Sequence, residues 1–175
     1  SVAKHFPGHG DTSDDSHNTL PAVHHDRARL DSVELLPFKR YIYDGYAGVM
    51  TGHLYVPALD KARNKPVSMS RAVVTDLLQK ELGFRGLCFT DALAMKGATT
   101  RKSDNPSVMA LLAGNDILLA PTAPINDFAA VKEALEEVIL DREEIEAKII
   151  KILQYKYIAG LNDYRPVETL SLIHI

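Results

Sequence analysis

The chain of 175 residues has a single cysteine, no tryptophan and no long apolar run. One cysteine excludes a disulfide within the chain, and no Cys-x-x-Cys pair is present to indicate a metal site. No apolar stretch approaches the roughly 18 residues that a membrane-spanning helix requires. We therefore expect neither a membrane segment nor a disulfide-stapled domain. Cys88 lies within an apolar run and is predicted to be a small core residue.

An excess of charge of either sign is also missing. The 20 Lys and Arg residues nearly balance the 23 Asp and Glu residues, and 46% of the residues are hydrophobic. These values are typical of an ordinary globular protein. No basic stripe interleaved with aromatic residues is present, so nucleic-acid binding is not expected.

Reactive side chains are concentrated near the start of the chain. The segment from Lys4 to His17 contains three histidines, three carboxylates and the lysine. Proline and two glycines interrupt it, which predicts a loop over residues 6–17 that folds over a pocket. Asp15 and His17 are two residues apart, so the carboxylate can fix the imidazole tautomer and raise its basicity. This pair indicates a general acid/base, and the structural alternative is a solvated polar loop with a chance pairing.

A second candidate residue follows a short apolar run. Residues 87–89 read as a buried strand of a parallel sheet, and Asp91 comes at its C-terminal end. In barrels of alternating strands and helices, catalytic groups collect at that end of the strands. An aspartate there can equally cap a following helix, and the residues of this segment alone leave both interpretations open.

Both segments resemble a known signature. Residues 4–17 read Lys-His-Phe-Pro-Gly-His-Gly, four residues, then Asp-Ser-His, which closely resembles family 3 glycoside hydrolases of the β-N-acetylhexosaminidase type. Residues 90–95 resemble that family's Ser/Thr-Asp-Asp/Ala-Leu-x-Met segment. The resemblance implies that His17 is the catalytic acid/base and Asp15 its partner. It implies further that Asp91 is the nucleophile, and that Lys4 and His5 bind sugar hydroxyls.

The implied activity is that of a retaining exo-β-N-acetylglucosaminidase. Such an enzyme would remove terminal β-linked N-acetylglucosamine from glycans such as peptidoglycan fragments, through a glycosyl-enzyme intermediate. A carbohydrate is then the partner, and no cofactor is expected. The alternatives within the family are a β-glucosidase and a glycoside phosphorylase.

An alternative from another class is a metal-dependent hydrolase. Its ligands would be the histidines and the carboxylate of the first segment, namely His5, His9, Asp15 and His17. No His-Glu-x-x-His motif supports it, and the positive charge of Lys4 would repel a cation, so no metal is expected.

Strand patterns alternate with helical patterns, which predicts βα units around a parallel sheet. The first expected strand ends near Ala3, and the second and third cover residues 47–51 and 87–89. Residues 116–119 lead into the fourth. The expected helices begin at about Asp31, with an Asp31–Glu34 capping box, at a cap on Ser70 and at Asn105–Pro106, and two more follow over residues 128–138 and from the cap at Asp141. In the last helix, Ile145, Ile149 and Ile152 are predicted to form a buried stripe.

Four βα units are half of an eight-stranded barrel, which typically takes about 250 residues. We therefore expect an α/β fold that is a fragment of a (β/α)8 TIM-type barrel, with strands five to eight and C-terminal helices over residues 1–162. Residues 163–175 are predicted to be a cloning scar or a linker to a further C-terminal domain. The missing partner would be the N-terminal half of the barrel, and the fragment alone is expected to be inactive. The sequence predicts no compartment, because relatives occur inside and outside the bacterial cell.

Histidines also occur at two other places in the sequence. His53 follows the second strand, so it is a candidate for substrate binding or for positioning a neighbour. The His24-His25-Asp26 segment is predicted to be solvated surface.

Overall fold

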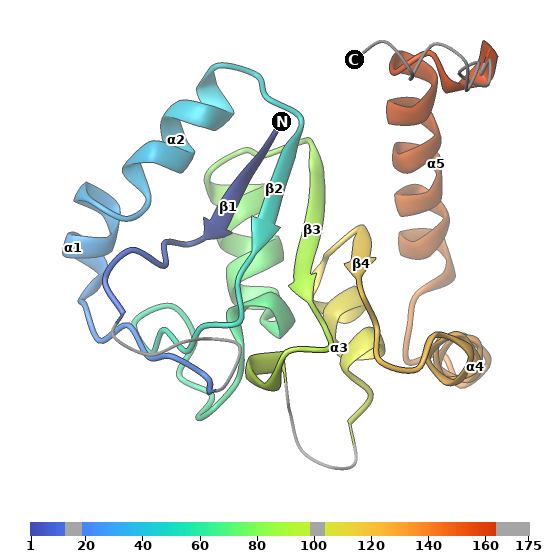
Figure 1. The fold of residues 1–175 in the computed structure, drawn as a ribbon, viewed down its shortest axis with the longest axis horizontal. Helices are drawn as coiled ribbons and strands as arrows, with labels where there is room; N and C mark the ends of the chain where they lie inside the picture. Colours follow the sequence, from blue (N-terminus) through green and yellow to red (C-terminus); the bar gives the residue numbers. More distant parts are fainter. Residues whose placement is uncertain (13–18, 99–103, 164–175) are drawn as a thin grey trace, which may run out of the picture.

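The computed structural model describes residues 1–12, 19–98 and 104–163, and its centre is a sheet of parallel strands (Figure 1). The strands of the described part are β1 (Val2–Phe6), β2 (Gly48–Thr51), β3 (Leu87–Ala92) and β4 (Ile117–Leu119). They lie side by side in chain order, and each neighbouring pair is parallel. The predicted α/β architecture with a parallel sheet is confirmed.

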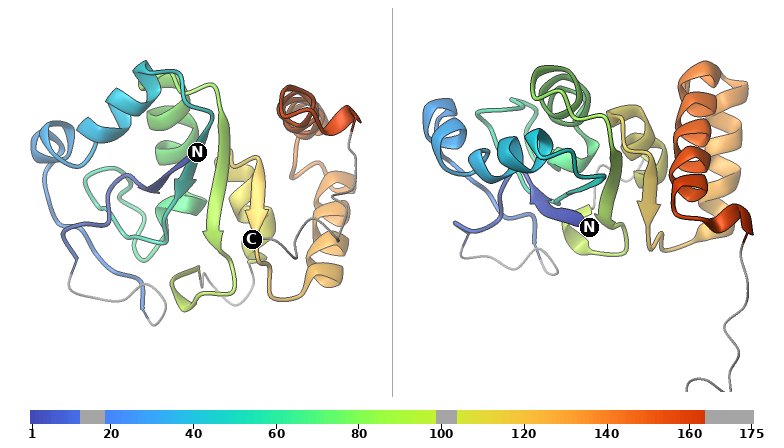
Figure 2. Two further views of the ribbon diagram at one scale, coloured as in Figure 1. Left: turned by 45° about the horizontal axis from the view of Figure 1, so that its top comes forward. Right: turned by 90° about the horizontal axis from the view of Figure 1, so that it is seen from above.

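Helices fill the connections between the strands, and two more follow β4 at one side of the sheet (Figure 2). The longer ones are α1 (Arg27–Ser32), α2 (Leu36–Tyr43), the π-helix η2 (Ala72–Glu81), α3 (Pro106–Ala113), α4 (Pro124–Glu136) and α5 (Arg142–Ile158). Three single 3-10 turns also occur, η1 (Val67–Met69), η3 (Lys96–Ala98) and η4 (Leu161–Asp163).

The core lies between these helices and one face of the sheet. Because side chains alternate along a strand, Val49 of β2 and its partner Cys88 of β3 point to the same face, and both are 0% exposed. They pack with Leu77 of η2 in the main hydrophobic cluster. Met50 and Phe89 point to the opposite face and are half-buried. Cys88 is thus a core residue, as predicted, and burial raises the pKa of its thiol to about 11.

Two predicted boundaries near the start of the chain are wrong. The strand β1 runs to Phe6 and does not end near Ala3, so Lys4 and His5 belong to the strand. The first helix begins earlier than Asp31, because the Asp26 side chain accepts the backbone N–H of Arg29 and caps α1. Asp31 lies inside that helix and pairs with Arg27.

The caps of the later helices are mostly as predicted. Asn105 caps α3, Gly114 ends it with φ of 114°, and the Asp141 carboxylate accepts the backbone N–H of Glu144 at the start of α5. The predicted cap by Ser70 is wrong. Its hydroxyl donates to Asp60 Oδ2 at 2.5 Å, and no side chain caps η2.

The predicted buried stripe on α5 is also wrong. No residue of α5 is buried, and Ile149 is 51% exposed. Charged contacts fasten the helix to the rest of the chain. Lys151 donates to both oxygens of Asp116, whose side chain is 0% exposed, at 2.9 Å, and Arg71 pairs with Glu144 at 3.1 Å. Within the described ranges, no helix is both long enough and apolar enough to cross a membrane.

Gly114 should be the glycine that tolerates substitution least at the end of a helix. A Cβ there would lie 2.4 Å from Thr75 Oγ1, whereas one at Gly83, with φ of 74°, would meet nothing within 4 Å. Gly83→Ala should therefore cost only the left-handed backbone strain, about 1 kcal/mol. Gly114→Ala should cost at least about 1 kcal/mol more, because the overpacked turn must shift. Urea unfolding of the two variants measures the difference, and equal losses would contradict this account.

Candidate active site

The ends of two strands bring an imidazole and a carboxylate together. His5 of β1 and Asp91 of β3 lean over the end of the intervening strand β2, and His5 Nε2 lies 3.5 Å from Asp91 Oδ2. Their side chains are 26% and 13% exposed, so both remain accessible to a ligand. Gly52, directly after β2, leaves room for this crossing, since a Cβ there would come within 3.1 Å of His5 Cβ.

The two oxygens of Asp91 have different surroundings. Oδ1 accepts the backbone N–H of Ala92 at 2.8 Å. Oδ2 faces His5 at a distance longer than the 2.9 Å or so of a well-formed hydrogen bond. Asp91 caps no helix, because it lies inside β3 and the next helical turn, η3, begins only at Lys96. The capping alternative for Asp91 is therefore wrong.

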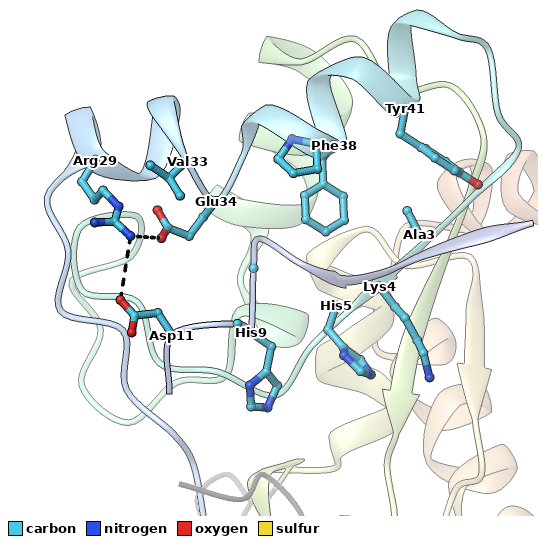
Figure 3. Close-up of a pocket in the computed structure, with 13 residues that line it drawn as sticks. Ala3, Lys4, His5, His9, Asp11, Arg29, Val33, Glu34, Phe38 and Tyr41 are labelled. Carbon is cyan, nitrogen blue, oxygen red and sulfur yellow. Dashed lines mark hydrogen bonds and ion pairs between the residues drawn. The ribbon is translucent and has the colours of Figure 1, made fainter. Parts of the chain in front are cut away.

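A cavity of about 730 Å³ lies beside β1. Figure 3 shows the cavity between two parts of the chain. On one side are β1 and the first residues of the motif loop, which is the loop predicted over residues 6–17. On the other side are α1 and α2. Lys4 and His5 line the cavity together with His9 and Asp11 of the loop. Asp91 is not among its lining residues. The cavity therefore adjoins the strand-end site, which is the pair of His5 and Asp91, but it is not centred on the carboxylate.

The motif loop has described contacts on both sides of residues 13–18. It leaves β1 at Phe6, and before residue 13 Thr12 Oγ1 lies 2.7 Å from His9 Nδ1. The returning segment pairs with the chain after β2, where the N–H of Val23 donates to the carbonyl of Tyr55 at 2.9 Å. The predicted acid/base pair, Asp15 and His17, lies between these anchors and outside the described residues.

Charged side chains tie the first half of the loop to the helices after it. Asp11 Oδ2 lies 2.6 Å from His25 Nε2. Arg29 pairs with Glu34 at 3.1 Å and with Asp11 at 3.9 Å (Figure 3). The contact of His25 with Asp11 was not predicted from the sequence. The two residues are 14 positions apart, and no spacing rule connects a loop residue to one beyond the next bend.

This charged cluster also bears on metal binding. Potential ligand atoms of Asp11, His25 and Glu34 lie within 4.8 Å of one another. The guanidinium of Arg29 contacts both carboxylates of the cluster and would repel a cation. We therefore interpret it as an ion-pair network. The metal-hydrolase alternative uses two histidines that the structure describes, His5 and His9. His9 is hydrogen-bonded to Thr12, and His5 faces Asp91.

His53 lies below the strand-end site and is 0% exposed. Its Nδ1 is 2.8 Å from Ser68 Oγ, and its Nε2 is 3.1 Å from the carbonyl oxygen of Ala92. Burial lowers the pKa of His53, which keeps the imidazole neutral. Both ring nitrogens are thus engaged inside the protein, which favours positioning over substrate binding for His53. No spacing in the sequence indicated that Ser68 and Ala92 would be its partners.

The comparison with known proteins identifies the family of this chain. Residues 1–155 match the Glycosyl hydrolase family 3 N terminal domain, and the chain belongs to this family. A curated relative, Beta-hexosaminidase A of Pseudoalteromonas piscicida, is 36% identical over 89% of this chain and 29% of its own length.

Solved structures give the same result. A family 3 beta-N-acetylglucosaminidase from Paenibacillus sp. str. FPU-7 superposes with a TM-score of 0.85 at 35% identity, over 95% of this chain and 32% of that chain. The beta-glucoside phosphorylase BglX superposes with a TM-score of 0.86 over 97% and 32%, but at 24% identity this likeness shows the fold alone. The chain thus spans about a third of the length of these proteins.

The neighbouring histidines 24 and 25 allow a matched test of the loop anchor. His25→Ala removes the partner of Asp11 and should speed the amide exchange of residues 8–12 by roughly two- to fivefold, because a half-exposed pair contributes up to about 1 kcal/mol. His24→Ala, at an exposed position, should leave these amides unchanged. Hydrogen exchange followed by mass spectrometry measures both, and equal exchange in the two variants would refute the anchor.

Proposed function

We propose that this chain carries the catalytic groups of a retaining family 3 exo-β-N-acetylglucosaminidase. Asp91 is the nucleophile, His17 the acid/base and Asp15 its partner, while Lys4 and His5 bind sugar hydroxyls. The substrate is a terminal β-linked N-acetylglucosamine of a glycan such as a peptidoglycan fragment. Support for the substrate comes from the names of the relatives, a beta-hexosaminidase and a beta-N-acetylglucosaminidase.

The observation that carries this proposal is the placement of Asp91. Its carboxylate stands at the C-terminal end of β3, partly exposed, with one oxygen held by the Ala92 N–H and the other facing His5. In sheets of this kind, reacting groups gather at the C-terminal ends of the strands. The oxygen Oδ2 then has a lone pair for the anomeric carbon, while Oδ1 is fixed by the backbone.

The reaction proceeds in two displacements. In the first, Asp91 Oδ2 forms a bond to the anomeric carbon, the glycosidic C–O bond breaks, and His17 gives a proton to the leaving oxygen. In the second, His17 takes a proton from water, the water oxygen attacks the anomeric carbon, and Asp91 is released as carboxylate. An imidazole suits both roles because its reference pKa of about 6.5 lies near working pH. Asp15 holds the imidazole in the tautomer that this cycle requires.

The side chains of β1 complete the sugar site. The ammonium of Lys4 and the imidazole of His5 come from consecutive residues at the end of the strand next to β2. Both can donate hydrogen bonds to hydroxyl groups. His5 also faces the nucleophile, so a sugar that it binds is held within reach of Asp91 Oδ2.

We propose further that the sheet is strands five to eight of an eight-stranded barrel. Two features support this arrangement. The strands β1 and β4 are the edges of the described sheet, and side chains such as Met50 and Phe89 are only half-buried on the face away from the core. An added half barrel would pair with both edges and cover that face. The isolated chain is then inactive, because the sugar site is incomplete.

The nucleophile assignment predicts the behaviour of Asp91→Asn in the full-length protein. Turnover of a chromogenic aryl β-N-acetylglucosaminide should fall to below about one thousandth of wild type, because the amide cannot form the glycosyl ester. Asp76→Asn, in an exposed pair with Lys80, is the matched control and should keep full activity. Residual turnover above about a tenth in Asp91→Asn would refute the assignment.

The acid/base assignment predicts a leaving-group dependence in His17→Ala. For a glycan leaving group, kcat/KM should fall about 10²- to 10⁴-fold, because that oxygen needs a proton. For an aryl group derived from a strongly acidic phenol, kcat/KM should fall by less than about tenfold, because this constant reports the first displacement only and the phenolate leaves unaided. An equal loss on both substrates would mean that His17 is not the proton donor.

A further inference from the structure

Four of the described polar residues with 0% exposure are linked to one another by hydrogen bonds: Thr51, His53, Ser68 and Asn115. Burying such groups costs free energy unless they are hydrogen-bonded, and all four are. They form one chain of contacts whose last member, His53, reaches the strand that carries Asp91.

The direction of the hydrogen bonds at His53 follows from its partners. The carbonyl of Ala92 can only accept, so Nε2 of His53 carries the proton and donates to it at 3.1 Å. The neutral ring then has a lone pair on Nδ1, which accepts from the hydroxyl of Ser68 at 2.8 Å. Ser68 is itself fixed, because its backbone carbonyl accepts a hydrogen bond from Nδ2 of Asn115 at 2.7 Å.

Ala92 transmits this contact to the nucleophile. Its carbonyl accepts from His53 and from the backbone N–H of Met95 at 3.0 Å, which fixes the peptide on one side of the residue. Its own N–H donates to Asp91 Oδ1 at 2.8 Å, which fixes the carboxylate on the other side. The position of the carboxylate therefore depends on the position of Ala92.

We propose that His53 is a positioning residue, which holds the carbonyl of Ala92 and thereby keeps Asp91 Oδ2 aimed at the anomeric carbon. The inference rests on the proposed role of Asp91 as nucleophile. It assigns His53 no contact with the sugar, in agreement with its complete burial. Because a displaced nucleophile slows the chemical step without weakening sugar binding, the loss on substitution should appear in kcat and not in KM.

The side-chain amides of glutamine and asparagine separate the two contacts of the ring. In His53→Gln, the amide NH₂ lies near the place of Nε2 and can still donate to Ala92. In His53→Asn, the shorter side chain places its amide near Nδ1 and reaches only Ser68. In the full-length protein, His53→Asn should lower kcat about 100-fold with KM within about twofold of wild type. His53→Gln should restore kcat to within about fivefold of wild type.

Thr75→Val is the matched control for loss of a buried hydrogen bond outside this chain of contacts. Thr75 Oγ1 donates to the carbonyl of Ala113 at 2.8 Å and contacts neither His53 nor Ala92 in the described hydrogen bonds. This variant should lose stability but keep kcat within about twofold of wild type. Ser68→Ala, which removes the hydroxyl that orients the ring, should lower kcat by about fivefold with KM unchanged, and it tests the inference even if His53→Asn does not fold.

The outcomes separate this inference from the function on which it rests. The inference is overturned if a folded His53→Asn keeps wild-type kcat, or if Ser68→Ala keeps wild-type kcat where His53→Asn does not fold. It is also overturned if the loss appears in KM, or if Thr75→Val loses as much kcat as His53→Asn. With Asp91→Asn inactive in the same assay, any of these results would overturn the role of His53 alone. An active Asp91→Asn would overturn both.

Discussion

Parallel pairing of consecutive strands is the constraint on which the rest of the structure depends. It places the C-terminal ends of β1, β2 and β3 at one edge of the sheet. His5 and Asp91 therefore meet there, although 85 residues lie between them in the sequence. The in-register pairing of β2 with β3 then decides which side chains face the helices and which face away. The contact between His5 and Asp91 follows from this pairing, with Gly52 leaving the space for it.

The approximate positions of β2, β3 and β4 and the caps of two helices were predictable because they depend on local patterns. The apolar run before Asp91 and the caps at Asn105 and Asp141 are such patterns, and the structure agrees with them. The family resemblance added roles that no pattern in the sequence could supply. All of these roles remain predictions, and Asp15 and His17 also lie outside the described residues.

What the sequence could not predict depends on contacts between distant residues. Ser70 has the residue type of a helix cap, but a carboxylate ten positions earlier takes its hydroxyl. His25 looked like surface until the loop brought Asp11 against it. The apolar spacing along α5 correctly indicated a helix, yet the surface that would bury Ile149 is not provided by the described part of this chain. Periodicity identifies a helix face and leaves its partner unspecified.

The attachment of α5 through Lys151 and the buried Asp116 has a consequence for how the protein comes apart. Asp116 also accepts the backbone N–H of Cys88 at 2.8 Å, so its carboxylate stays bonded to β3 when the lysine leaves. Because no residue of α5 is buried, lifting the helix away opens no hole in the hydrophobic core. Unfolding of this chain is therefore expected to start as a separation of its last helix, with the sheet and the carboxylate of Asp91 remaining in place.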